Sequence, residues 1–180
     1  MIMRETHRPY TVLRSERHTI GRINVLMDTI LINGKEKPFT YIDYRDSVCI
    51  LPVYDGKVIA IKQYRHALDS WELELPCGGV DPGESQPEAA RRELMEETGY
   101  VAGDLHFLGN YHTNQGYSSS TCGVYFTNCL KSGKPMREET ELISTLEIPL
   151  DEFEKMIGDN RFRLLIGIIA WYQAKRQRLI

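Results

Sequence analysis

The sequence of 180 residues lacks an excess of positive charge. It contains 22 Lys and Arg against 25 Asp and Glu, which gives a formal net charge of −3. Proteins that hold nucleic acid or an anionic membrane by bulk electrostatics need a basic surface. We therefore expect no nucleic-acid partner and no membrane partner. A polyanionic ligand would therefore bind only at a site where a local group supplies positive charge.

Paired cysteines and long apolar runs are also absent from the sequence. The four cysteines form no C-x-x-C pair, the spacing that structural zinc sites use. The first residues carry no apolar segment of a secretory signal, and the longest apolar run, 164–172, is far shorter than the roughly 20 residues of a membrane span. We expect reduced thiols and a cytoplasmic location. The run predicts the packed face of a final helix, formed by Leu164, Leu165, Ile168, Ile169 and Trp171.

Turn signals and periodicity predict the order of the elements. Asn33-Gly34 and Asp55-Gly56 each separate two β-rich stretches, and both dipeptides are strong hairpin signals. Further strands are expected at 72–75, 105–112, 123–129 and 144–148, and helices at 87–98, 150–157 and 161–177. The fold class is therefore α+β with a mixed β-sheet. Residues 1–45 are expected to form an N-terminal antiparallel β extension on a domain of residues 46–180.

The helix expected at 87–98 carries a concentrated negative face. At about 100° per residue, Glu93, Glu96 and Glu97 share an arc of roughly 100°. Like charges at i,i+4 cost a few tenths of a kcal/mol, roughly, so stability alone does not favour this arrangement. Gly78 and Glu84 lie in the Gly-rich loop before the helix, where backbone can approach a bound phosphate or metal. Clustered carboxylates suit the hard cations Mg²⁺ and Mn²⁺.

A purely structural interpretation of this helix is also open. Glu88 with Arg92, and Arg92 with Glu96, are stabilising i,i+4 pairs, and most charged helices are simply solvated. The Gly-rich loop and Glu84 favour the binding site over this interpretation.

The same residues resemble the box of the Nudix hydrolase family, which reads G-x5-E-x7-R-E-U-x-E-E-x-G-U, where U is aliphatic. The matching positions are Gly78, Glu84, Arg92, Glu93, Leu94, Glu96, Glu97 and Gly99. Tyr100 departs from the pattern, being aromatic where an aliphatic residue is usual, and we expect it to pack away from the chemistry. The resemblance implies an α/β/α sandwich and hydrolysis of a nucleoside diphosphate linked to another group.

The resemblance also implies a metal shell. Glu93 and Glu97 would be the principal ligands of Mg²⁺, with Mn²⁺ as an alternative. Glu96 would be a further ligand or a base that acts on water. The backbone carbonyl of Cys77 would join the shell.

Two further residues of the box would support the shell. Glu84 would orient Arg92, and Arg92 would hold the carboxylates in place.

The flanks of the box are similar to those of ADP-ribose pyrophosphatases and related nucleoside-diphosphate-sugar hydrolases. The segments that carry this similarity are Gln63-Tyr64-Arg65 and residues 72–79. Arg65 and Glu74 are the implied substrate contacts, although a surface arginine and a solvent-facing strand glutamate are equally open. Enzymes with a similar N-terminal β element are typically homodimers.

Two further segments contain implied site residues. These hydrolases place a catalytic or metal-binding glutamate in a late loop, and here Glu139 or Glu141 would take that role unless the loop is merely solvated. Tyr117 could stack on a base or ribose, or it could simply be packed. Around it, residues 114–120 lack the proline and both acids that ADP-ribose hydrolases commonly carry.

We therefore expect metal-dependent hydrolysis of ADP-ribose or a similar nucleoside diphosphate sugar, giving a nucleoside monophosphate and a sugar phosphate. One alternative is a Nudix hydrolase of another nucleotide, such as a dinucleotide cofactor or an oxidised nucleotide. A second alternative, from another functional class, is a weakly catalytic domain that serves as a nucleotide-sugar sensor or interaction module.

Overall fold

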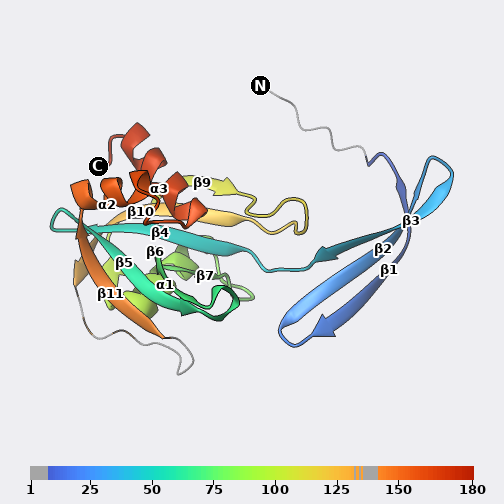
Figure 1. The fold of residues 1–180 in the computed structure, drawn as a ribbon, viewed down its shortest axis with the longest axis horizontal. Coiled ribbons are helices and arrows are strands. Elements are labelled where there is room, and N and C mark those ends of the chain that lie inside the picture. Colours follow the sequence, from blue (N-terminus) through green and yellow to red (C-terminus); the bar gives the residue numbers. More distant parts are fainter. Residues whose placement is uncertain (1–7, 132, 134, 136–141) are drawn as a thin grey trace. The chain divides into compact units, whose positions relative to one another are not determined.

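The computed structural model describes residues 8–131, 133, 135 and 142–180. The chain divides into two compact units, each with its own sheet (Figure 1). The N-terminal unit comprises the described residues up to Tyr44 together with Asn114–Ser120. The second unit comprises Arg45–Thr113 and the described residues from Thr121 to Ile180.

The N-terminal unit is an antiparallel sheet in the order β1-β2-β3. Its strands are β1 (Thr11–Ile20), β2 (Ile23–Ile32) and β3 (Lys35–Ile42). Asn33 and Gly34 connect β2 to β3 with φ angles of 51° and 70°, the left-handed pair that a tight hairpin turn requires. The predicted N-terminal antiparallel β extension is confirmed.

The second unit contains a mixed sheet and helices on both of its faces. Its elements are β4 (Ser47–Tyr54), β5 (Lys57–Arg65), the 3-10 helix η1 (His66–Leu68), β6 (Ser70–Glu74), β7 (Cys77–Gly79), α1 (Gln86–Thr98), β8 (Tyr100–Ala102), β9 (His106–Tyr111), β10 (Cys122–Lys131), β11 (Ile143–Pro149), α2 (Leu150–Gly158) and α3 (Leu165–Arg176). The central order is β11-β5-β4-β10-β8. β10 runs parallel to β4, and the other pairings of this sheet are antiparallel, so the predicted mixed sheet is confirmed.

Strands β4 and β5 form the hairpin predicted from Asp55-Gly56. Val53 pairs with Val58, and the two turn residues have positive φ angles of 47° and 69°. Beyond this end the two strands separate, because β5 continues against β6 and β4 continues against β7. The loop to α1 then follows the end of β7.

Strand β4 is buried on both faces, which fixes the layers of the fold. Ile50 packs in one cluster with Ala90 of α1, whereas Leu51, the next residue, packs in another with Phe153 of α2 and Trp171 of α3. Successive side chains of a strand point to opposite faces, so α1 covers one face and α2 and α3 cover the other (Figure 1). The predicted α/β/α sandwich is confirmed.

The last helix differs from its prediction in where it begins and which side chains it buries. It begins at Leu165 rather than 161, because the preceding segment folds back and its Phe162 is fully buried. Leu165, expected in the packed face, is 67% exposed. The other predicted residues do pack: Trp171 is buried, and Leu164, Ile168 and Ile169 lie partly buried against the same core. The prediction missed Ile166, Gly167, Ala170 and Ala174, which are also buried. Among the described residues, no helix is both long and apolar enough to span a membrane.

Candidate active site

Helix α1 presents the carboxylates because both of its ends are fixed. Ser85 and Glu88 form a reciprocal capping box, in which the Ser85 N–H donates to Glu88 Oε2 at 2.8 Å. At the other end Gly99 adopts a φ of 77° and donates its N–H to the carbonyl of Met95. Caps of this kind each contribute about 1 kcal/mol, so the helix ends where the sequence predicted.

Arg92 is the centre of the polar network at this helix. Its Nε and Nη2 donate to the two oxygens of Glu84, both at 2.9 Å. Its Nη1 donates to Glu93 at 2.7 Å and to Glu96 at 3.1 Å. The Nη2 group also donates to the carbonyl of Gly79 at 2.8 Å, which ties the helix to strand β7.

The charges in this network shift one another. Hydrogen bonds from Arg92, followed by one from the backbone of Asp81, lower the pKa of Glu84 to about 2. The pKa of Arg92 is raised, first by its bonds to Glu84 and then by those to the helix carboxylates. Since three carboxylates share one guanidinium, the cluster keeps an excess of negative charge.

Strand β7 lies against the carboxylates of α1. The N–H of Cys77 donates to Glu97 at 3.1 Å, and Glu97 is only 4% exposed. A Cβ placed on Gly78 would come within 2.0 Å of the Glu93 carboxylate, so any larger residue here would displace that carboxylate. The structure therefore brings Cys77, Glu84, Arg92, Glu93, Glu96 and Glu97 together.

The donor set suits a divalent cation of the hard kind. Its side chains are all carboxylates, and Mg²⁺ prefers oxygen ligands, keeps several waters and uses only one or two protein carboxylates. Among the described residues, no three His, Cys, Asp or Glu side chains are already gathered around one point as a closed metal site would gather them. The fit therefore rests on the oxygen chemistry of the donors and on the small number of protein ligands that Mg²⁺ requires.

Arg65 and Glu74, predicted as separate substrate contacts, bind each other. Arg65 Nε and Nη2 reach the two oxygens of Glu74 at 2.6 and 2.5 Å. The Glu74 side chain is 8% exposed and that of Arg65 is 40% exposed, so this is a part-buried bidentate pair. The bonds to Glu74 are the main cause that raises the pKa of Arg65, and the charge of Glu97 adds to the rise. Arg65 is therefore within electrostatic reach of the helix carboxylates.

Three predicted site residues remain, Tyr117, Glu139 and Glu141. Tyr117 belongs to the N-terminal unit, where its carbonyl accepts a hydrogen bond from the Ile42 N–H at 2.7 Å and its side chain is exposed. Glu139 and Glu141 lie outside the described residues. Their roles stay predictions.

Tyr100, the departure from the family box, packs away from the carboxylates. It is 2% exposed, its ring meets that of Tyr54, and its hydroxyl donates to Glu147 at 2.7 Å.

The sequence interpretation missed a second polar group beside Glu74. Glu72 accepts hydrogen bonds from the Ser70 hydroxyl and from Arg163 Nη2. The alternation Glu72-Leu73-Glu74 already places both acids on one face of a strand. Arg163 could not be assigned to this place from sequence, because it lies 91 residues away from its partner.

Comparisons with known proteins agree with this geometry. The profile of the NUDIX domain matches residues 43–166. The ADP-ribose pyrophosphatase of Bacillus subtilis is 32% identical over 133 residues, which cover 72% of each chain. The ADP compounds hydrolase NudE of Escherichia coli is 32% identical over 164 residues, covering 90% of this chain and 86% of that protein.

A solved structure shares the fold over almost the whole chain. A crystal structure of an ADP compounds hydrolase superposes with a TM-score of 0.83 at 27% identity, covering 97% of this chain and 96% of that one. The chain belongs to the Nudix hydrolase family.

Proposed function

We propose that this Nudix hydrolase cleaves the diphosphate linkage of ADP-ribose or a similar nucleoside diphosphate sugar in the presence of Mg²⁺, releasing a nucleoside monophosphate and a sugar phosphate. The observation that carries the proposal is the network in which Arg92 holds Glu84, Glu93 and Glu96 beside the buried Glu97. The names of the two curated relatives support the substrate class.

In this proposal the chain's own carboxylates hold the cation. Glu93 and Glu97 are the principal ligands, with the Cys77 carbonyl and Glu96 as further oxygen donors. When bound, the cation neutralises the diphosphate and activates water for attack on phosphorus. Mn²⁺ offers the same coordination chemistry and is the expected substitute.

Arg92 acts as a positioning residue. Its guanidinium restrains the carboxylates of Glu93 and Glu96 and is itself held in place by Glu84. Such hydrogen bonds fix the rotamers of metal ligands before the substrate arrives. Glu96, the most exposed of these carboxylates at 36%, is the one best placed to exchange protons with solvent, which suits a base.

The substrate side of the site is assigned to Arg65 and Glu74, with Tyr117, Glu139 and Glu141 as further candidates. Arg65 keeps its charge beside the buried Glu74, and a guanidinium is the side chain that best matches phosphate oxygens. Arg65 is therefore suited to contact the diphosphate, and Glu74 to contact the groups attached to it.

The assembly and its setting are part of the proposal. We infer that the chain is a homodimer, as relatives with a similar N-terminal β element typically are. The exposed apolar side chains of the N-terminal sheet support this inference. The free thiols of Cys49, Cys77, Cys122 and Cys129 support a reducing, cytoplasmic setting.

A substrate panel tests the proposal. The protein is incubated with ADP-ribose, other nucleoside diphosphate sugars, dinucleotide cofactors and oxidised nucleoside triphosphates, each with Mg²⁺ and with a chelator. Products are separated by anion-exchange chromatography. The proposal expects AMP and ribose 5-phosphate from ADP-ribose only with the cation. A preference for a dinucleotide or a triphosphate would replace the substrate class, and tight binding without any product would favour a sensor.

A further inference from the structure

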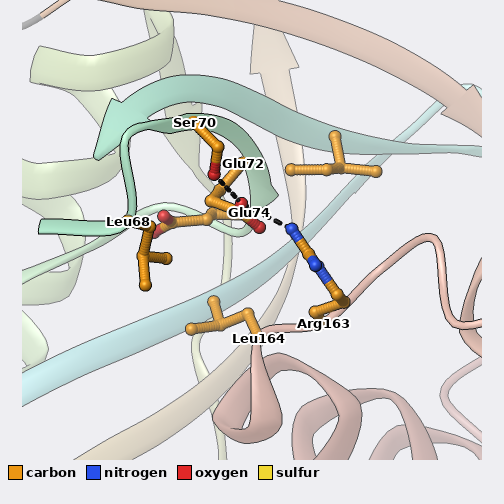
Figure 2. Close-up of a pocket in the computed structure, with 7 residues that line it drawn as sticks. Leu68, Ser70, Glu72, Glu74, Arg163 and Leu164 are labelled. Carbon is orange, nitrogen blue, oxygen red and sulfur yellow. Dashed lines mark hydrogen bonds and ion pairs between the residues drawn. The ribbon is translucent and has the colours of Figure 1, made fainter. Parts of the chain in front are cut away.

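A pocket of about 310 Å³ lies beside the Arg65–Glu74 pair and is distinct from the carboxylate cluster of α1. Polar side chains of β6 line one side of it, and the segment that leads into α3 lines the other (Figure 2). The residues that line it and bear on its chemistry are Leu68, Ser70, Glu72, Glu74, Arg163 and Leu164. Small-molecule sites usually measure about 300–1,000 Å³, so this pocket can hold one part of a nucleoside diphosphate sugar and not the whole molecule.

Glu72 has a carboxylate oxygen that can still accept a hydrogen bond from a ligand in this pocket. The residue is 8% exposed, and both of its hydrogen bonds, from Ser70 and from Arg163, go to the same oxygen, Oε1 (Figure 2). Within the described part of the chain, no group donates to Oε2. An ionised carboxylate oxygen only accepts hydrogen bonds, so a ligand that brings an O–H or N–H into the pocket would suit Oε2.

Arg163 supplies the complementary donors. Its Nη2 reaches Glu72 at 2.6 Å, and its side chain is otherwise 57% exposed. A guanidinium carries five N–H donors. Among the described residues Arg163 uses few of them, so the others can donate to a ligand oxygen. An acceptor and a set of donors thus lie side by side at one wall of the pocket.

The charge of the pocket excludes the phosphates of the substrate. Two carboxylates, Glu72 and Glu74, line it with one guanidinium, and Arg65 compensates Glu74 from outside. A diphosphate brings no proton at neutral pH and could not donate to Glu72, whereas a sugar hydroxyl both donates and accepts. The ligand chemistry that satisfies both walls is therefore an uncharged polyol.

We propose that Glu72 and Arg163 bind a sugar hydroxyl of the substrate in this pocket and so set the enzyme's preference for hydroxyl-bearing nucleoside diphosphate derivatives. The inference rests on the proposed function. It adds two contacts to the site, and it assigns the polyol part of the substrate to the β6–α3 pocket while the diphosphate goes to the helix carboxylates.

The test compares wild type with Glu72→Gln and Arg163→Gln on three substrates. These are ADP-ribose, the β-methyl ester of ADP, which lacks the distal sugar, and 2′-deoxy-ADP-ribose, which lacks a hydroxyl of the nucleoside sugar. A site built for a hydroxyl rejects the analogue that lacks it. Wild type should therefore favour ADP-ribose over one analogue in kcat/KM by tenfold or more, and each variant should lose most of that preference through a higher KM for ADP-ribose.

The substrate whose discrimination collapses identifies the sugar. Loss against the methyl ester assigns the distal sugar, and loss against the deoxy compound assigns the nucleoside sugar. Arg161→Gln is the matched control, because Arg161 pairs with Glu152 and Asp159 and does not line this pocket. Its preference should equal that of wild type. Arg163→Lys and Ser70→Ala replace the first variants if urea unfolding shows that either of those is not folded.

Two results contradict the inference, and a third contradicts the proposed function. If wild type hydrolyses ADP-ribose but the folded variants keep the full wild-type discrimination, the pocket does not bind the sugar, and the proposed function stands. If wild type discriminates against neither analogue, the inference also fails. If wild type leaves every substrate intact, the proposed function itself fails.

Discussion

The two units of the chain differ in how far they bury their apolar side chains. In the second unit the strands of the central hairpin are buried on both faces, and the acids around Arg92 are held by hydrogen bonds. In the N-terminal sheet Ile20 and Phe39 are 67% and 45% exposed, and Ile30 is the one buried apolar residue among those described. A small sheet needs a covered apolar face to be stable. The catalytic unit therefore has its own hydrophobic core. The N-terminal sheet needs another surface to cover its apolar side chains, and the proposed homodimer would provide one.

Of the three substitutions that probe this comparison, removing Arg92 should give the largest effect. Arg92→Met leaves the carboxylates of Glu84, Glu93 and Glu96 without their shared cation. We expect the free energy of unfolding to fall by about 1–3 kcal/mol and kcat/KM to fall about 10–100-fold. Urea unfolding and initial rates measure the two quantities.

The neighbouring arginine provides the control. Arg91 donates to the carbonyls of Ala102 and Gly103 at 3.0 and 2.9 Å and touches no carboxylate in the described residues. Arg91→Met should lower stability but leave kcat/KM near its wild-type value. An equal loss of activity in both variants would contradict a special role for Arg92.

A smaller effect is expected from the N-terminal sheet, and it should be seen in assembly rather than in catalysis of the folded unit. Phe39→Ser removes an exposed ring of β3, so it should change the stability of the isolated chain little. If the sheet forms the dimer contact, the substitution should weaken dimerisation about tenfold or more. Sedimentation velocity over a concentration series measures this shift.

Lys37→Ser is the matched substitution on the same face of β3, since residues two apart in a strand point the same way. It should leave the dimer intact. A dimer that tolerates Phe39→Ser would place the contact elsewhere on the molecule.

The smallest effect is expected from the helix cap. The bonds from the Ser85 hydroxyl and backbone lower the pKa of Glu88. A carboxyl whose folded pKa is lowered stabilises the folded state above its unfolded pKa of about 4.3, and this contribution is lost as the pH falls through the folded value. The difference in unfolding free energy between wild type and Glu88→Gln should therefore be constant above about pH 5 and shrink in more acidic solution. Urea unfolding from pH 7 to pH 3 tests this, and a difference that grows on acidification would be contrary to it.

Local signals determined most of what could be foreseen from the sequence. The Asp55-Gly56 hairpin and helix α1, ended by Gly99, depend on neighbouring residues, and both were predicted. The spacing of the glutamates likewise indicated the cluster. The i,i+4 spacing also predicted the pair of Arg92 with Glu96, whereas the bonds of Arg92 to Glu84 were expected only through the family resemblance.

Long-range packing determined what could not be foreseen. The packed face of the final helix was predicted from its large apolar residues, and this missed the small ones. Gly167 packs closely in the core, because a Cβ on it would come within 2.7 Å of the Phe162 ring. The bidentate pairing of Arg65 with Glu74 depends on the register between β5 and β6, which no local signal encodes. Arg163 reaches Glu72 through tertiary folding alone.

Hydrolysis by this protein should depend on a cation held by the buried helix carboxylates, and Glu97→Gln is the substitution that probes this dependence with the least change in shape. Glu97 is 4% exposed and bound to the Cys77 N–H, and glutamine keeps its size while removing its charge. AMP release from ADP-ribose with saturating Mg²⁺ is measured for wild type, Glu97→Gln and the control Glu88→Gln on the same helix. The rate of AMP release should fall at least about 100-fold in Glu97→Gln and stay near the wild-type rate in Glu88→Gln. A folded Glu97→Gln protein with full Mg²⁺-dependent activity would contradict this role of the helix carboxylates.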